Sequence, residues 1–399
     1  MQEKALILCL AVQDWIIFRD NECNAETTSL HFLESLLHLL LVESLSYDDI
    51  TTLLLRCLVG GFCVFDWILL SPDNPMFRRP ASVATLQYFT VALRINPPPS
   101  SLALAAYFGD VAIVEALMKV CKREDLSETV TLEFGTWFMT SEYLRCKGTA
   151  AQLALWQGHT TCASIITGSV DASTVCGVPR HATVLAQAMR LHTMSFEYHM
   201  CFPVVDPVSL QRGEKLGEGG FGDVYRAAWV HGDGRKRLVA VKVLTLPTLS
   251  SEQYEETLGM IATELVVGLR FLKVLAFTVP AGLNEVWIVS NLYGIGTLKG
   301  LLQARRLTER QRRQIADSLA IELYRMHGDT LQQDGNLPIL HGDIKTDNVL
   351  VAKEQRPVKV HEGFVLSFDP SPGPLEDYYV AHLADYGLAT IYVTKLSGR

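Results

Sequence analysis

The sequence predicts an α+β chain in two parts: a helical part over residues 1–200, and a mixed sheet-and-helix part over residues 210–399. Composition changes between them. All nine cysteines lie between Cys9 and Cys201, and the first 200 residues hold 13 Lys/Arg against 20 Asp/Glu, whereas the rest hold 22 against 23. Local pattern changes too, from repeated helix–turn–helix segments to strand–turn–strand. Because 49% of the residues are hydrophobic and 20% are charged, the chain is globular rather than disordered.

Charge and cysteine usage exclude several classes of protein. The net charge of −8 argues against a nucleic-acid binder and against a protein attracted to acidic membranes. Cys57 and Cys63 are close in sequence, but no second pair of ligands completes a metal site. We therefore expect reduced thiols in a cytoplasmic protein, and the remaining classes are enzymes and protein-interaction modules.

No membrane span is expected. Ala5–Val12 is apolar but has no basic cluster before it and no cleavage site after it, so it predicts a core helix rather than a signal peptide. Thr51–Leu70 contains Arg56 and Asp66, each of which costs about 2.5–3.5 kcal/mol at the centre of a bilayer.

Three segments of the first part share one pattern. Thr52–Leu70, Ser100–Met118 and Thr149–Thr167 each begin with Ser or Thr and have a glycine nine places later. Ser or Thr can cap a helix, and glycine suits the left-handed residue that ends one. The pattern predicts a helix, a tight turn and a second helix in each segment. The glycines are Gly61, Gly109 and Gly158.

The helices of this pattern have small and apolar faces. Ala105, Ala106 and Ala154 would let a neighbouring helix approach closely, and Ile113, Val114 and Leu117 recur at helical spacing. The segments resemble degenerate ankyrin repeats, with insertions that lengthen the usual period of about 33 residues. The resemblance implies a surface for a protein ligand. An unrelated helical domain with a chance glycine spacing is the alternative.

A glycine-rich segment opens the second part. Leu216–Val224 reads LGEGGFGDV, in which three glycines form G-x-G-x-x-G. Glycines let backbone N–H groups approach phosphate oxygens. A dinucleotide-binding fold would continue with a helix. Here Val224–Val230, the turn His231–Arg235 and Leu238–Leu244 predict strand, turn and strand instead.

Three further motifs carry charged groups. Lys242 stands in the apolar strand VAVK, where it needs an anionic partner unless it reaches solvent at a sheet edge. His341–Asn348 reads HGDIKTDN; Asp343, Lys345 and Asn348 could converge as carboxylate, ammonium and amide, or form only a polar loop. The segment ADYGLA then offers Asp385 as a metal ligand.

In this order, the four motifs are similar to those of eukaryotic-type protein kinases, over about Leu210 to Thr390. The resemblance implies a bilobal domain with an N-lobe over 210–293 and a partial C-lobe over 294–399, ATP and Mg²⁺ as cofactors, and a protein substrate. The Asp-x-Lys after the histidine is similar to serine/threonine kinases. The residues that would surround ATP are Leu216, Gly217, Gly219, Gly220, Gly222, Val224, Ala240, Leu350 and the hinge Val289-Ser290-Asn291-Leu292.

The resemblance also implies the catalytic roles. Lys242 would contact the α- and β-phosphates, with Glu264 as its helix partner or Glu256 as the alternative. Asp343 would be the catalytic base, with Lys345 beside the moving phosphate. The Mg²⁺ ligands would be Asn348 and Asp385.

The sequence departs from the family pattern in several places. Gly342 replaces the usual Arg before the catalytic Asp, which implies a kinase not switched by phosphorylation of its activation loop. The 36 residues between Asn348 and Asp385 exceed the usual number, and Phe368–Pro374 predicts a surface loop there. The basic run Arg305–Arg313 predicts the solvated face of a helix.

Two functions remain open. Only 12 residues follow Gly387, so the sequence lacks the activation segment and the later helices of the large lobe. The first hypothesis is a serine/threonine kinase, possessing N-terminal repeats that bind protein partners. The second is a catalytically inactive kinase-like scaffold.

Overall fold

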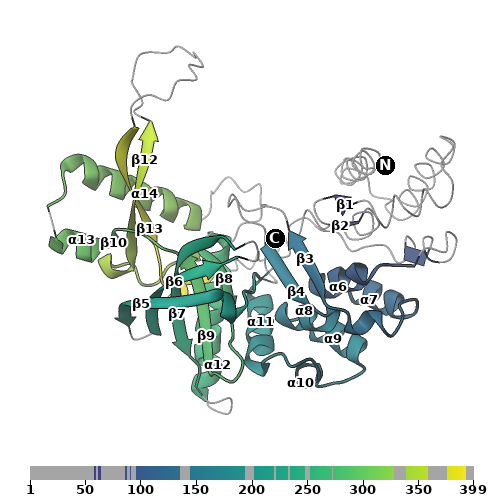
Figure 1. Ribbon diagram of the computed structural model, residues 1–399. Coiled ribbons are helices and arrows are strands. Elements are labelled where there is room, and N and C mark those ends of the chain that lie inside the picture. The colour runs from purple at the N-terminus through teal and green to yellow at the C-terminus, as the bar shows by residue number, and fades with distance from the viewer. Residues whose placement is uncertain are drawn as a thin grey trace, which may run out of the picture. The chain divides into compact units, whose positions relative to one another are not determined.

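The computed structural model describes residues 58–59, 62–63, 86–87, 90, 96–134, 144–193, 202–219, 222–231, 234–247, 252–271, 273–304, 306–327, 338–357 and 375–391. The chain divides into two compact units (Figure 1). The first comprises Met1–Thr193, Tyr198–Pro207 and Ala276–Val286, and the second comprises Met194–Glu197, Val208–Leu275 and Trp287–Arg399. The predictions for Ala5–Val12, Gly220 and Phe368–Pro374 lie outside the described residues.

The first unit contains helices and, among its described residues, two antiparallel pairs of strands. Its elements, in chain order, are α6 (Pro99–Phe108), α7 (Val111–Met118), β3 (Val130–Phe134), β4 (Leu144–Gly148), α8 (Ala150–Trp156), α9 (Thr160–Thr167), α10 (Ala172–Cys176) and α11 (Arg180–Thr193). Strands β3 and β4 pair antiparallel. Helix α8 contacts α6 and α11, and α7 contacts α9, so the helices form two adjoining rows.

Two of the three predicted helix–turn–helix segments are confirmed. Gly109 ends α6 in the left-handed conformation, with φ of 78°, and Gly158 follows α8 with φ of 81°. Thr149 caps α8 through a reciprocal pair of hydrogen bonds with Gln152. The predicted cap at Ser100 is wrong: α6 begins at Pro99, and proline, which lacks an N–H, suits the first helical position.

The prediction for the first segment is wrong where the structure describes it. Leu58–Val59 and Phe62–Cys63 are short strands, β1 and β2, that pair antiparallel. The dipeptide Gly60-Gly61 stands between them, and two glycines between apolar residues favour a two-residue hairpin over a helix. The remainder of Thr52–Leu70 lies outside the described residues.

The two glycine turns are also points of close approach. A Cβ on Gly109 would lie 2.2 Å from Nδ1 of His159, and a Cβ on Gly158 would lie 2.8 Å from the carbonyl carbon of Ala186 in α11. Each turn therefore packs against a residue of the following helical segment. The buried faces of α6, α7 and α8 include the predicted residues Ala105, Ala106, Ile113, Val114, Leu117 and Ala154.

We expect Gly158→Ala to destabilise this unit more than Gly168→Ala. Both glycines have positive φ, for which an L-residue costs about 1–2 kcal/mol. Only Gly158 also lies against backbone, whereas a Cβ on Gly168 would meet nothing within 4 Å. Thermal unfolding followed by circular dichroism should show the larger fall in Tm for Gly158→Ala. Equal losses would contradict the close packing of α11 on this turn.

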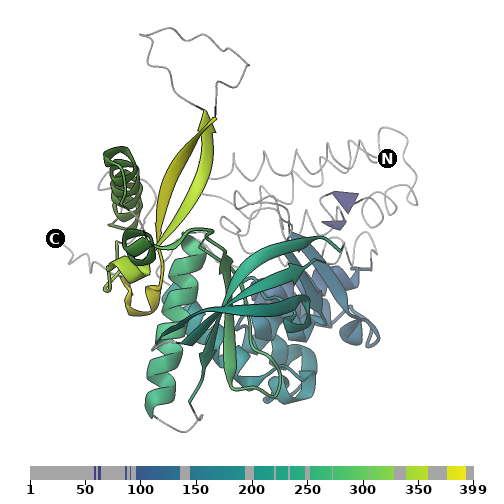
Figure 2. The same cartoon turned by 60° about the vertical axis from the view of Figure 1, so that its left-hand side comes forward.

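A five-stranded sheet has the strand order β5-β6-β7-β9-β8, and helix α12 lies against it (Figure 2). The predicted strand–turn–strand is confirmed, because β6 and β7 pair antiparallel around a turn in which Gly234 has φ of 83°. The bounds are β5 (Leu210–Gly219), β6 (Gly222–Val230), β7 (Lys236–Thr245), α12 (Glu252–Arg270), β8 (Val274–Thr278) and β9 (Glu285–Asn291).

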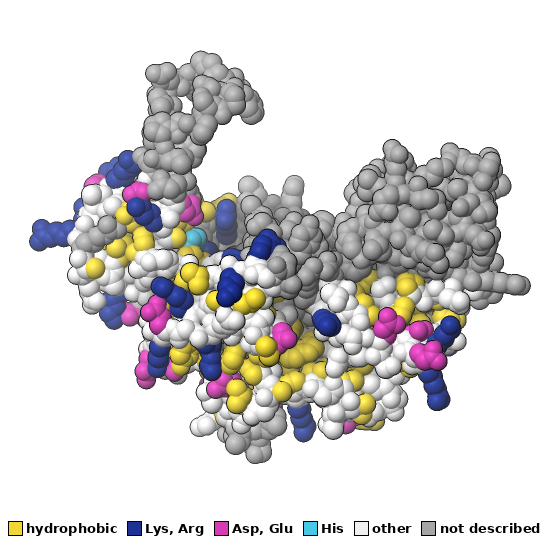
Figure 3. All heavy atoms as spheres, in the orientation of Figure 1, with side chains coloured by type: hydrophobic (Ala, Val, Ile, Leu, Met, Phe, Trp, Pro, Cys, Tyr) yellow, Lys and Arg dark blue, Asp and Glu magenta, His cyan; other side chains and the backbone are white. Residues whose placement is uncertain are grey.

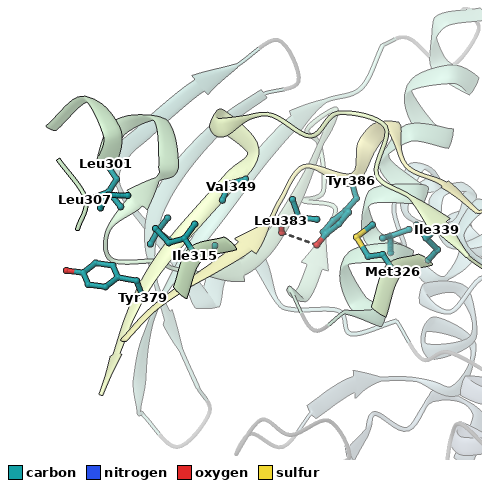
Figure 4. Close-up of a cluster of buried hydrophobic side chains, with 12 residues drawn as sticks. Leu301, Leu307, Ile315, Met326, Ile339, Val349, Tyr379, Leu383 and Tyr386 are labelled. Carbon is teal, nitrogen blue, oxygen red and sulfur yellow. Dashed lines mark hydrogen bonds between the residues drawn. The ribbon is translucent and has the colours of Figure 1, made fainter. Parts of the chain in front are cut away.

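Helices and smaller sheets follow. Strands β10 (Gly296–Thr297), β12 (Val349–Pro357) and β13 (Leu375–Leu383) form one sheet; β11 (Ile339–Leu340) pairs with β14 (Thr390–Ile391). The long β12–β13 pair accounts for part of the added length between Asn348 and Asp385. Apolar side chains from α12, α13 (Leu298–Ala304), α14 (Glu309–His327) and these strands make one core (Figure 4).

The last part of the basic run, from Glu309 on, lies as predicted on a solvated helix face, whereas residues 306–308 precede the helix. Arg310, Arg312 and Arg313 are exposed in the first turns of α14, and the last two pair with Glu309 at 3.1 Å. On the face drawn in Figure 3, Lys and Arg side chains are interspersed with Asp and Glu. Such surface pairs contribute about 0–1 kcal/mol, so the run keeps the helix hydrated rather than anchoring it.

Candidate active site

The glycine-rich segment forms the hairpin between β5 and β6. Gly217 lies opposite Val224, and Gly219 lies opposite Gly222. Gly222 has φ of 127°, and a Cβ there would lie 2.3 Å from the carbonyl oxygen of Val243, so this position requires glycine.

Ion pairs lie across this hairpin. The Nζ of Lys215 on β5 lies 2.8 Å from Glu218 and 2.9 Å from Asp223 on β6. These two carboxylates hold the pKa of Lys215 above its ordinary value. One cation thus offsets two negative charges beside the glycines of the hairpin.

Strand β7 presents one face to the site. Val239, Val241 and Val243 are buried in the sheet's other face, and the alternation of the strand places Ala240 and Lys242 together. Val224 lies directly opposite Lys242 on β6, so it shares that face. The sheet therefore offers an apolar surface that ends in a cation.

Lys242 joins two carboxylates that are far apart in sequence. Its Nζ lies 2.8 Å and 2.9 Å from the two oxygens of Glu264 on α12, and 2.9 Å from Oδ1 of Asp385. Burial alone lowers the pKa of Lys242, but the charges of Glu264 and Asp385 outweigh burial and raise that pKa, so the ammonium stays charged. Of the two partners predicted for Lys242, the structure brings Glu264 to it, whereas Glu256 is exposed.

The hinge residues lie at the end of β9. Val289 is buried, and Ser290 and Asn291 are half-buried. The Oδ1 of Asn291 accepts a hydrogen bond of 2.6 Å from the guanidinium of Arg237 on β7. The side chain of Asn291 is thereby held by Arg237.

The HGDIKTDN segment brings its three polar side chains together. Oδ2 of Asp343 lies 2.6 Å from Nζ of Lys345 and accepts a hydrogen bond of 2.8 Å from the amide of Asn348. The same amide donates to the backbone carbonyl of Asp343 at 3.0 Å. The hydrogen bond from Lys345 lowers the pKa of Asp343, so this side chain is a carboxylate at neutral pH.

The residue types suit a nucleotide and its metal. Asn348 uses its amide nitrogen on Asp343, which leaves the amide oxygen for a cation, and Asp385 supplies a carboxylate. Mg²⁺ is commonly held by one or two carboxylates together with substrate phosphates. Leu350 is half-buried on β12, as are Val224 and Ala240 on the sheet face that carries Lys242.

The backbone requires glycine at position 342, for a reason that the sequence did not reveal. Its φ is 80°, and a Cβ would lie 2.4 Å from the carbonyl oxygen of Leu388. The backbone that follows Asp385 therefore packs directly on the loop that carries Asp343. The neighbouring pairing of β11 with β14 continues this contact.

A buried group of polar residues was also missed. Lys273 contacts both Glu322 and His382, although the three residues are far apart in sequence. They belong to no motif, so only the three-dimensional structure brings them together.

Comparison with known proteins agrees with this geometry. Residues 210–392 match the family model for protein tyrosine and serine/threonine kinases. This part of the chain is therefore similar in sequence to protein kinase domains, those of serine/threonine kinases among them.

The individual relatives are distant. The serine/threonine-protein kinase CTR1 of Arabidopsis thaliana is 34% identical over 149 residues, which cover 35% of this chain and 16% of CTR1. Human activin receptor type-1B is 29% identical over 145 residues, covering 35% of this chain and 27% of the receptor. The Drosophila melanogaster kinase pelle is 31% identical over 149 residues, which cover 34% of this chain and 27% of pelle. The chain thus spans between about a sixth and a quarter of the length of these relatives.

No described helix is both long enough and apolar enough to cross a membrane.

Proposed function

We propose that this protein is a serine/threonine kinase, which transfers the γ-phosphate of Mg·ATP to hydroxyl groups of a protein substrate. The observation that carries the proposal is the position of Lys242 between Glu264 and Asp385. A lysine fixed by a helix glutamate, with a metal-binding aspartate beside it, is the arrangement that orients ATP in this family.

Each residue then has a chemical task. Bound Mg·ATP supplies the electrophilic phosphorus and the leaving group. Lys242 neutralises phosphate charge, and Asp343 is placed to accept the proton of the substrate hydroxyl. Lys345 lies beside Asp343 and stabilises negative charge on the transferred group. Asn348 and Asp385 would hold the Mg²⁺ that accompanies ATP.

The first unit is proposed to bind a protein partner through ankyrin-like repeats. The support is its paired helices, the left-handed glycines after α6 and α8, and the close approach of each turn to the next segment. Leu58–Val59 and Phe62–Cys63, which are paired strands, are not included in these repeats.

Nucleotide binding tests the enzyme proposal directly. Titration of the whole protein with Mg·ATP should raise Tm, because a ligand that binds only the folded state at 100 times its Kd stabilises that state by about 2.7 kcal/mol. The rise in Tm should require Mg²⁺, and AMP should raise Tm by less than ATP does. No shift at millimolar Mg·ATP would contradict the proposal and favour an inactive kinase-like scaffold.

A further inference from the structure

The ion network behind the site consists of Lys273, Glu322 and His382. The Nζ of Lys273 lies 2.8 Å from Oε1 of Glu322 and 2.7 Å from Nδ1 of His382. The side chains of Lys273 and Glu322 are only 17% and 9% exposed. A pair of charges buried to this extent loses most of its hydration, so stability alone is a weak reason for it.

Lys273 fixes the end of helix α12. Its backbone N–H donates a hydrogen bond of 2.8 Å to the carbonyl of Gly268, in the last turn of the helix. Gly268 in turn packs so closely on Val274 that a Cβ would lie 2.4 Å from the Cγ2 atom of that valine. The ammonium of Lys273 is thereby held relative to the helix that carries Glu264.

Glu322, on α14, reaches the strand that leads to Asp385. Its Oε2 accepts a hydrogen bond of 2.9 Å from the backbone N–H of Leu383. The carbonyl of Leu383 accepts a hydrogen bond of 2.9 Å from the hydroxyl of Tyr386 (Figure 4). One carboxylate therefore contacts both the ammonium of Lys273, just past the end of α12, and the backbone N–H of Leu383, two residues before Asp385.

His382 completes the network as a neutral acceptor. Its Nδ1 faces the ammonium of Lys273, and burial, then the charge of Lys273, lowers the pKa of His382 to about 4. The ring of Tyr293 packs on the imidazole with the ring centroids 4.8 Å apart, and Glu354 is the other charged group that acts on it. The imidazole of His382 thus shields the Lys273–Glu322 pair from water on one side.

We propose that Glu322 and Lys273 are positioning residues that hold α12 and β13 at the separation at which Glu264 and Asp385 share Lys242. The inference rests on the proposed kinase function. A carboxylate that is joined to α12 through Lys273 and to β13 through the N–H of Leu383 restricts the movement of one element relative to the other. Its loss should weaken Mg·ATP binding even where the fold is intact.

The test compares variants of the whole protein by Tm, by KM for Mg·ATP and by kcat. Glu322→Gln leaves Lys273 buried with no carboxylate, so both Tm and kcat/KM should fall. In Lys273→Met/Glu322→Met the pair is replaced by apolar side chains, which commonly restores stability. Its kcat/KM for Mg·ATP should nevertheless remain about 10–100-fold below that of the wild type, the size of loss typical when groups that orient metal ligands are removed.

Two further variants make the result decisive. Glu309→Gln removes an exposed carboxylate from the same helix and should change neither Tm nor KM. Glu322→Asp keeps the charge but shortens the side chain, so it should fold and raise KM for Mg·ATP. Wild-type kcat/KM in both Glu322→Asp and the folded double variant would overturn the inference. A wild-type protein that binds no Mg·ATP would overturn the proposed function instead.

Discussion

Substitution of Asp343 by Asn should reduce kcat for phosphotransfer by about 10²–10⁴-fold, the contribution of a positioned general base. The mutant amide cannot accept the hydroxyl proton. Its oxygen can still accept the hydrogen bond that Asn348 now donates to Oδ2, and the second bond from Asn348, to the backbone carbonyl of residue 343, is untouched. The fold and the affinity for Mg·ATP should therefore change little. Single-turnover transfer of labelled γ-phosphate to casein, beside nucleotide titration, measures the two effects separately.

Asp377→Asn provides the matched control. Asp377 is an exposed aspartate on β13 whose carboxylate lies 2.7 Å from Lys353, away from the proposed site. It undergoes the same chemical change and should keep the wild-type rate. An unchanged kcat in Asp343→Asn, with bound Mg·ATP, would remove Asp343 from the role of base.

The pH dependence follows from the same hydrogen bonds. Because Lys345 lowers the pKa of Asp343 below its ordinary value of 3.8, the basic form persists to lower pH. The rate should therefore not fall through protonation of Asp343 between pH 8 and pH 5. A fall in this range must come from another group.

Local sequence patterns identified the parts of the structure that local chemistry determines. The β6–β7 hairpin follows from two apolar runs around a polar turn, and the cap at Thr149 follows from Gln152 three residues later. The same reasoning misassigned Ser100, because the proline at position 99 determines where that helix begins. It also misassigned Leu58–Cys63, where two glycines favour a hairpin.

Long-range contacts could not be predicted in the same way. The sequence left Glu256 and Glu264 as alternatives, because both lie in one helical segment and their choice depends on how α12 rotates against β7. Glu322 contacts Leu383, 61 residues later, and a local sequence pattern cannot predict a contact between residues so far apart in the chain. At Gly342, comparison with the motif showed only that the usual arginine is absent. The structure shows that this residue has a positive φ and lies close to the backbone of Leu388.

Substitution of Lys242 by Met should abolish most phosphotransfer and also destabilise the protein. The variant leaves Glu264 and Asp385 near one another without the cation they share, and breaking a buried ion pair costs about 3–5 kcal/mol. Side chains of Lys242 and Glu264 are only 16% and 11% exposed, so water screens the remaining charges poorly. Removing a group that stabilises transition-state charge lowers kcat by about 10²–10³-fold, and Kd for Mg·ATP should rise as well.

Comparison of Lys242→Met with two other variants separates catalysis from stability. Lys236→Met, at the exposed start of the same strand, should retain wild-type Tm and rate. Lys242→Met/Glu264→Gln removes one of the two opposed carboxylates and should recover part of the lost Tm, because less negative charge remains buried. It should recover none of the phosphotransfer, since neither side chain can then neutralise or orient phosphate. If the double variant regained activity together with Tm, Lys242 would be needed for folding alone, and the charge that faces ATP would have to come from elsewhere in the domain.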